Sequence, residues 1–142
     1  MFQIQDVLIP ARFICFILQV LLTLSILFGR SDFILASVEE NSDKYKGVRD
    51  SFITYLVFFF FFEALEFFIL LTGYTLFINL LSVVQIFLHS VADLILNWFY
   101  RDVWESKYIY IPFIIGGIVP FLLEIYNIIV LCSSNRTIFK IK

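Results

Sequence analysis

Five ionisable side chains lie inside long apolar stretches of the sequence: Glu63, Glu66, His89, Asp93 and Glu124. A charged group at the centre of a membrane span costs roughly 2.5–3.5 kcal/mol on insertion scales, so such a residue indicates a specific role. Carboxylates and a histidine could form a metal cluster, pass protons along a path, or hydrogen-bond neighbouring helices.

The spacing of these residues distinguishes the three uses. Di-iron helix bundles carry a paired Glu-x-x-His motif, which the chain lacks, and His89 is its only histidine, so we predict no metal site. A proton path needs only buried carboxyl groups and an imidazole, but a chain of this size would have to oligomerise to form a pore. We therefore interpret the polar residues as a cluster for helix packing or partner docking.

Motifs for other chemistry are missing from the sequence. It contains no glycine-rich phosphate loop, no nucleophile elbow and no His-x-x-x-His or Cys-x-x-Cys pattern. No basic patch is large enough for nucleic acid. We therefore predict a protein that is not an enzyme, with no cofactor, no small-molecule substrate and no nucleic-acid partner.

The composition indicates which elements must position the polar residues. Hydrophobic residues make up 61% of the 142 residues and charged residues only 15%, whereas soluble domains are about half apolar and about a quarter charged. Because lipid offers the backbone no hydrogen bonds, apolar blocks of about 20 residues must cross it as helices. The predicted fold class is an all-α membrane protein, in which one domain, 1–142, forms a compact bundle of four transmembrane helices: 13–28, 52–72, 78–100 and 108–132.

Three connections join these spans. Residues 29–50 form the only long one, which we expect to be a solvated loop that rests on the membrane through Phe33, Ile34 and Leu35. Residues 73–77 form a tight turn, so the second and third spans are antiparallel neighbours. In the third connection, 101–107, Trp104 and Glu105 are expected at the membrane surface, where an amphipathic indole is favoured.

Polar residues follow one face of several spans. On the third span they recur every three or four residues and occupy roughly a third of the helix circumference: Ser82, Gln85, His89, Asp93 and Asn97. The fourth span has a corresponding face on which small, proline and polar residues recur every three or four residues: Pro112, Gly116, Pro120, Glu124 and Asn127. Glu63 and Glu66 are three residues apart on the second span and share a face.

Depths in the membrane follow from a rise of about 1.5 Å per residue. Measured from the loop side, Asp93 lies about 10 Å deep and Gln19 about 14 Å deep on that rise. Glu63 and His89 both lie about 16 Å deep, and Glu66 and Glu124 a little over 20 Å deep. We therefore expect the polar groups of different helices to meet in layers, with Glu66, His89 and Glu124 facing inward.

The order and spacing of five short segments carry a family resemblance. They are "LIPARF" before the first span, "EFFILLTGYTLF" at the end of the second, "LLSVVQIFLHS" in the third, "VWES" before the fourth and "PFLLE" within it. With these segments the chain resembles the transmembrane protein 107 family along nearly its whole length. The positions that match the family are Pro10, Arg12, Phe13, Glu66, Gly73, Ser82, His89, Trp104, Glu105, Pro120 and Glu124. Glu63 and Asp93 do not match, and Glu63 is expected to be a local partner of His89 or Gln19.

The resemblance implies a non-enzymatic tetraspan scaffold in the membrane of the ciliary transition zone. Such a protein supports cilium assembly and controls which membrane proteins enter the cilium, with membrane lipids and the membrane and soluble proteins of the Meckel module as its partners. It also implies that both termini are cytoplasmic. The count of lysines and arginines leans slightly the other way, although the tail "RTIFKIK" is purely basic.

Two other functions remain open from the residues alone. Small phenylalanine-rich spans with buried polar residues also occur in accessory subunits of mitochondrial membrane complexes. The buried carboxyl groups and His89 would also suit a small proton or ion conductor. Localisation of the protein to the ciliary base or to mitochondria would distinguish the scaffold from the accessory subunit. Ion or proton flux that depends on Glu66 or His89 would distinguish a conductor from both.

Overall fold

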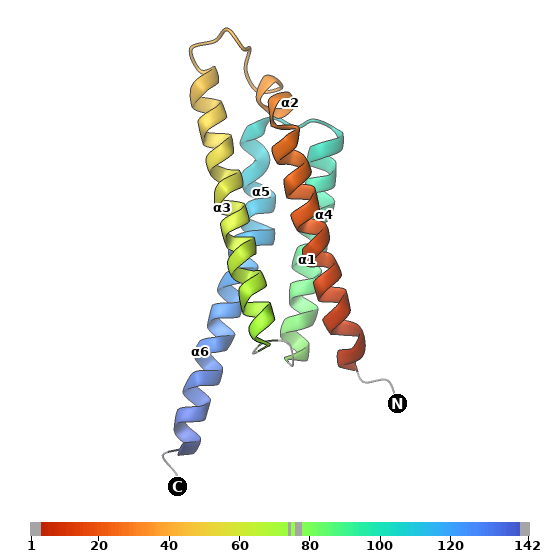
Figure 1. Ribbon diagram of the computed structural model, residues 1–142, viewed down its shortest axis with the longest axis vertical. Coiled ribbons are helices and arrows are strands. Elements are labelled where there is room, and N and C mark those ends of the chain that lie inside the picture. The colour runs from red at the N-terminus through yellow and green to blue at the C-terminus, as the bar shows by residue number, and fades with distance from the viewer. Residues whose placement is uncertain (1–3, 74, 76–77, 140–142) are drawn as a thin grey trace.

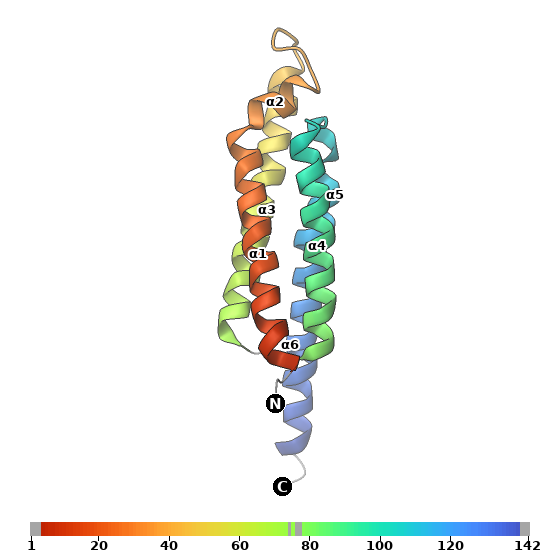
Figure 2. The ribbon, with the colours of Figure 1, turned by 90° about the vertical axis from the view of Figure 1, so that its right-hand side faces the viewer.

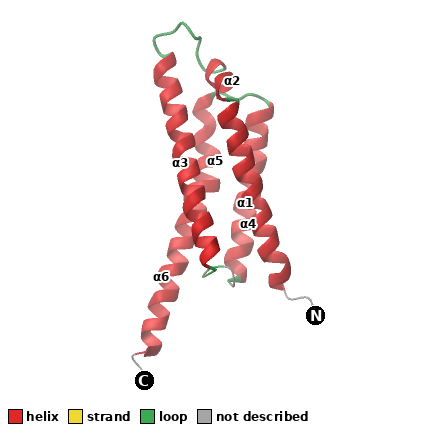
Figure 3. Ribbon diagram, viewed as in Figure 1, coloured by secondary structure: helices red, strands yellow, loops and turns green. Residues whose placement is uncertain are grey.

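The computed structural model describes residues 4–73, 75 and 78–139, and the side chains among them up to residue 134. Every regular element in this part of the chain is a helix (Figure 3). Four long apolar helical segments pack side by side, which confirms the predicted fold class.

Each long helical segment is apolar enough to cross a membrane. The first three are single α-helices that cover the predicted spans almost completely: α1 (Ile4–Phe28), α3 (Tyr45–Thr72) and α4 (Asn79–Arg101). The fourth changes its winding along its length and consists of four consecutive pieces: η1 (Ser106–Ile109), α5 (Tyr110–Phe113), η2 (Ile114–Ile118) and α6 (Val119–Phe139).

The four segments run alternately up and down. The first turn of α1 and the last turn of α6 therefore lie at the same end of the bundle, and α6 extends well beyond the other helices there (Figures 1 and 2). At that end α3 stops at Gly73, whose φ of 74° is left-handed and caps the helix. The rest of the predicted turn, at Tyr74, Leu76 and Phe77, lies outside the described residues.

The long connection differs from the expected solvated loop. Its first part forms the short helix α2 (Arg30–Leu35). Of the three apolar residues expected on the membrane, Phe33 and Ile34 are buried in this helix and Leu35 is exposed. Phe33 stacks on Phe99 with a distance of 4.9 Å between the ring centroids. The expectation that this segment rests on the membrane is therefore wrong for Phe33 and Ile34, because they complete the inside of the bundle.

The interior divides into two halves of different character. The half next to α2 is an apolar cluster formed largely by aromatic and branched side chains: Ile26, Phe33, Ile34, Phe52, Leu56, Phe59, Leu96, Phe99, Ile109 and Phe113. Most buried polar side chains lie in the other half, toward the end of the bundle at which α1 starts. The apolar cluster supplies the hydrophobic packing, so specific pairing of the helices falls to the polar half.

Candidate functional site: a polar network across four helices

A three-residue chain of hydrogen bonds joins α1, α4 and α3 at the middle of the bundle. The His89 Nδ1 atom lies 2.8 Å from the Oε1 atom of Gln19, and its Nε2 atom lies 2.8 Å from the Oε1 atom of Glu66. All three side chains are at most 2% exposed. The ring of Phe16 packs edge-on against the imidazole and holds it in place.

Gln19 determines which nitrogen of His89 carries a proton. Its Nε2 atom donates a 2.8 Å hydrogen bond to the carbonyl oxygen of Gly116, which can only accept. The Oε1 atom of Gln19 must therefore accept from His89, so Nδ1 carries a hydrogen. One further proton is then shared between the Nε2 atom of His89 and the carboxyl group of Glu66, either as a neutral pair or as an ion pair.

The fourth span presents the Gly116 carbonyl because its backbone is interrupted there. Pro120 lies four residues after Gly116 and has no N–H to donate to that carbonyl in an α-helix. The segment Ile114–Ile118 accordingly winds as a π-helix, a form that is often found at functional sites. Gly116 has no side chain, so the fourth span can approach α1 and α4 closely: an added Cβ atom would lie 2.6 Å from the Cβ atom of Ala92.

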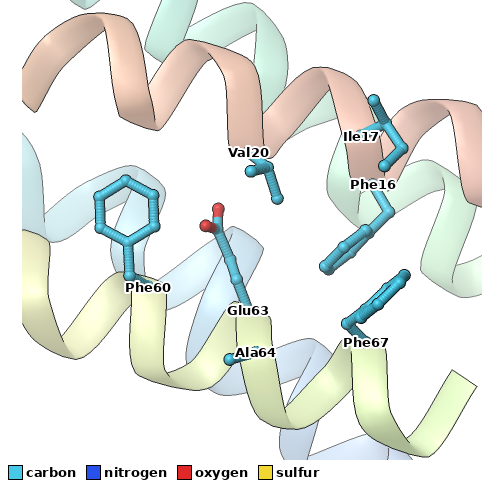
Figure 4. Close-up of a pocket in the computed structure, with 7 residues that line it drawn as sticks. All are labelled: Phe16, Ile17, Val20, Phe60, Glu63, Ala64 and Phe67. Carbon is cyan, nitrogen blue, oxygen red and sulfur yellow. The ribbon is translucent and has the colours of Figure 1, made fainter.

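Glu63 belongs to the same layer but does not bind His89. Its Oε1 atom accepts hydrogen bonds from Gln19 at 3.3 Å and from the hydroxyl group of Thr23 at 3.1 Å. Of the two partners predicted for Glu63, the structure places Gln19 beside it, because Gln19 lies between Glu63 and His89. The side chain also borders a largely apolar groove between α1 and α3, with a volume of about 270 Å³, and points toward α1 (Figure 4).

A second polar layer lies nearer the chain termini. Arg12 of α1 forms an ion pair with Glu124 of α6, and the two side chains are 2% and 0% exposed. Gln85 of α4 donates a 3.0 Å hydrogen bond to the carbonyl oxygen of Pro120 and a longer one, 3.4 Å, to Glu124. The layer therefore joins the first, third and fourth spans.

The predicted first span, 13–28, begins just after Arg12, whereas the structure places Arg12 inside α1. The helix continues upstream to Ile4, and Arg12 and Gln19 are seven residues apart, almost two whole turns, so they share one face. Depth was the available signal: Arg12 lies about 24 Å from the end of α1, which is close to the depth expected for Glu124. A buried arginine opposite a buried glutamate could have been inferred from these two numbers.

The predicted polar face of α4 is right for four of its five residues. Ser82, Gln85 and His89 are fully buried and Asp93 is 6% exposed, but Asn97 is exposed. Each step of four residues turns the helix by about 400°, so two such steps after His89 carry Asn97 about 80° away from the buried face. Leu96 and Phe99 occupy that face instead.

Trp104 and Glu105, the predicted interface edge, lie between α4 and η1. The Trp104 ring is partly buried, and it packs at an angle against Phe99 and Tyr108. Glu105 is exposed and forms an ion pair with Lys107 at 2.6 Å. In the same connection, the hydrogen bond from Arg101 lowers the pKa of the Asp102 carboxyl group.

The network can hold four helices in register, and Glu66 provides a test of it. We expect Glu66→Leu to insert normally in the membrane but to lose about 1–3 kcal/mol of stability, because the His89 Nε2 atom and its neighbours are left without a partner in an apolar medium. Thermal unfolding in detergent measures the loss, and carbonate extraction checks insertion. Glu66→Gln keeps a hydrogen-bonding group of the same size and should lose clearly less. Equal losses for the two variants would contradict the assignment.

Within residues 4–73, 75 and 78–139, no group of three His, Cys, Asp or Glu side chains could hold a metal ion. These residues thus form a four-span helical membrane protein whose polar groups join all four spans internally. A family model described as TMEM107, transmembrane protein, matches residues 8–128. The chain therefore belongs to the TMEM107 family, which confirms the resemblance seen in its sequence. This family of small tetraspan membrane proteins is known from the ciliary transition zone and has no known catalytic activity. Searches of curated proteins and of solved structures found no match.

Proposed function

We propose that the protein is a non-enzymatic scaffold in the membrane of the ciliary transition zone, where it anchors membrane and soluble proteins of the Meckel module. The observation that carries this proposal is the family match over residues 8–128, which includes nearly all of the four spans. In this role the protein supports cilium assembly and helps to control which membrane proteins enter the cilium.

The internal structure supports a scaffold. Arg12, Glu66, His89 and Glu124 direct their polar groups at partners inside the bundle, so these side chains stabilise the bundle itself. The outer faces of the helices carry large apolar side chains, among them Phe58, Phe68 and Phe87, each more than half exposed. Such faces can pack against lipid or against the spans of neighbouring proteins.

The distribution of buried groups argues against a proton path through a single copy. The polar layers occupy only part of the bundle, and the apolar cluster closes the half next to α2. Leu56, Phe59 and Leu96 are 0% exposed there and offer no hydrogen-bonding side chain. Flux across proteoliposomes that depends on Glu66 or His89 would favour a conductor.

Localisation and deletion test the scaffold role. A tag placed on the endogenous protein is expected at the base of the cilium, and deletion of the gene is expected to leave axonemes able to form. A resident ciliary membrane protein should then leak from the cilium, or fewer cilia should form, as quantitative imaging can measure. A tag on mitochondria, with unchanged cilium number and composition after deletion, would favour the accessory-subunit alternative instead.

For the topology we propose cytoplasmic termini, with residues 29–50 on the opposite face of the membrane. The family match and the purely basic tail "RTIFKIK" motivate this orientation, whereas the count of lysines and arginines leans the other way, more so because Arg12 is paired inside the bundle. A C-terminal epitope should therefore be accessible to antibody after selective permeabilisation of the plasma membrane. The tail also contains the glycosylation sequence Asn-Arg-Thr at residues 135–137. Protection of the epitope, or a glycan on Asn135, would reverse the orientation.

A further inference from the structure

Asp93 is the buried carboxyl group that the network does not use. Glu63, Glu66 and Glu124 each meet a donor within the bundle. The side chain of Asp93 is also buried, at 6% exposure, but its Oδ1 atom has no hydrogen-bond partner. Among the side chains that the structure describes, no basic group forms an ion pair with it.

His89, four residues earlier on α4, is the basic side chain nearest in sequence, and its two ring nitrogens are hydrogen-bonded to Gln19 and Glu66. Three basic side chains at the loop-side end of the bundle also have other partners. Arg101 pairs with Asp102 at 2.8 Å, and Lys107 pairs with Glu105 at 2.6 Å. Arg30 donates to the carbonyl oxygen of Leu27. None of these groups forms an ion pair with the Asp93 carboxyl group.

Asp93 lies in the wall of a groove between α1 and α4. These are the two long helices nearest the viewer in Figure 2. The groove has a volume of about 490 Å³, and both helices give it apolar walls through Leu18, Leu22 and Leu94. Leu18 and Leu94 are 47% and 58% exposed, so the groove opens on the outer face of the bundle. Ser90 and Asn97 lie three residues before and four residues after Asp93 and add a polar group on either side of it.

Depth and charge decide which occupant fits. Asp93 lies about 12 Å from the loop-side end of α4, on the rise of an α-helix, and so well below the polar surface of the bilayer. Lipid headgroups remain at that surface, whereas side chains of membrane helices occur at this depth. Ionisable residues within membranes typically pair with one another, and a lysine or arginine is the complement of a buried carboxylate. Its long apolar stem can lie along Leu94 while its charged end reaches the carboxyl group.

We propose that this groove docks one transmembrane helix of a partner protein, through a single lysine or arginine that pairs with Asp93. The inference rests on the proposed scaffold function and adds the surface and the kind of partner. Ser90 and Asn97 contribute hydrogen bonds across the helix interface.

A designed peptide tests the pairing directly, because the proposal asks only for a membrane helix with one basic residue at a defined depth. The full chain, labelled with a donor fluorophore, is placed in liposomes with acceptor-labelled leucine-rich peptides of about 20 residues. One peptide carries a single lysine at the depth of Asp93, and the matched peptide carries leucine there. We expect the lysine peptide to bind at least about tenfold more tightly, since truncation of a buried charge pair costs more than that factor.

Substitutions in the chain complete the test. Asp93→Asn, checked for unchanged thermal unfolding, should bind the lysine and leucine peptides equally. Asp93→Lys should instead prefer a peptide with aspartate at that position, which a loss of folding could not produce. Asp50→Asn removes an exposed carboxylate from α3 and should leave both affinities unchanged.

Three results would overturn the pairing. The first is equal binding of the lysine and leucine peptides to the unsubstituted chain. The second is an Asp93→Asn variant that still binds the lysine peptide more tightly than the leucine peptide. The third is a photoactivatable sterol that labels the groove only when Asp93 is present and that the lysine peptide does not displace. The last result would assign the groove to a lipid. If the peptide test fails but the tagged chain is found at the ciliary base, only this interface is overturned. Absence of the chain from the ciliary base overturns the scaffold role, whatever the peptides show.

Discussion

Replacing Arg12 by methionine is expected to lower the free energy of unfolding of the bundle by about 3 kcal/mol, because it leaves the fully buried Glu124 without its cation. Methionine keeps much of the apolar stem of arginine, so packing changes little and the loss reports on the charge. Unfolding in mixed micelles, followed as the denaturing detergent is increased, measures the difference.

Two further variants separate the pair from general damage. Arg12→Met combined with Glu124→Leu removes both charges, and we expect it to be clearly more stable than the sum of the two single losses predicts. Arg49→Met breaks an exposed pair with Asp50, whose side chains are 46% and 54% exposed, and should cost at most about 1 kcal/mol. Equal losses for Arg12→Met and Arg49→Met would contradict the buried ion pair.

The second large effect is expected at Gly116. In Gly116→Ala the new Cβ atom would lie 2.6 Å from the Cβ atom of Ala92 and 2.7 Å from the Oε1 atom of Gln19. The helices must then move apart, which costs about 1–3 kcal/mol for overpacking alone. The displacement also weakens the hydrogen bond from Gln19 to the Gly116 carbonyl, so we expect a loss at or above the upper end of that range.

Gly47 is a matched control within the same chain. It also lies in a helix, near the start of α3, but a Cβ atom there would meet nothing within 4 Å. Gly47→Ala should leave stability unchanged or raise it by up to about 1 kcal/mol, because alanine favours a helix more than glycine does. If Gly116→Ala behaved like Gly47→Ala in the same unfolding assay, α1, α4 and the fourth span could not be as close as described.

The two predictions concern different layers of one network. Arg12 and Glu124 join the first and fourth spans near the termini, whereas Gly116 admits Gln19 and so supports the layer that contains His89 and Glu66. Both layers cross between helices that are distant in sequence. Their loss should therefore loosen the relative placement of the helices more than the helices themselves, and helical content should change less than the unfolding midpoint.

The membrane character, the helical class and the approximate spans follow from the sequence by itself. They depend on local properties: runs of apolar residues of sufficient length, and the need of a backbone in lipid to satisfy its own hydrogen bonds. Helical periodicity likewise predicted which side of α4 is polar, from Ser82 to Asp93. It failed at Asn97 because small angular steps accumulate along a helix, and the position at which a face leaves the interior depends on the neighbouring helices.

Only the tertiary structure decided which polar group meets which. Depth alone made Glu63 and His89 equal in height, yet His89 binds Glu66 because Gln19 of α1 stands between it and Glu63. The pairing of Arg12 with Glu124, and the burial of Phe33 and Ile34 in a segment expected to lie on the membrane, have the same origin. Periodicity and depth fix a side chain's angle on its own helix and its height, but a partner also depends on the order and spacing of the helices around the bundle. That arrangement results from packing between residues far apart in the chain, such as Gly116 against Ala92 and Gln19, which no local pattern contains.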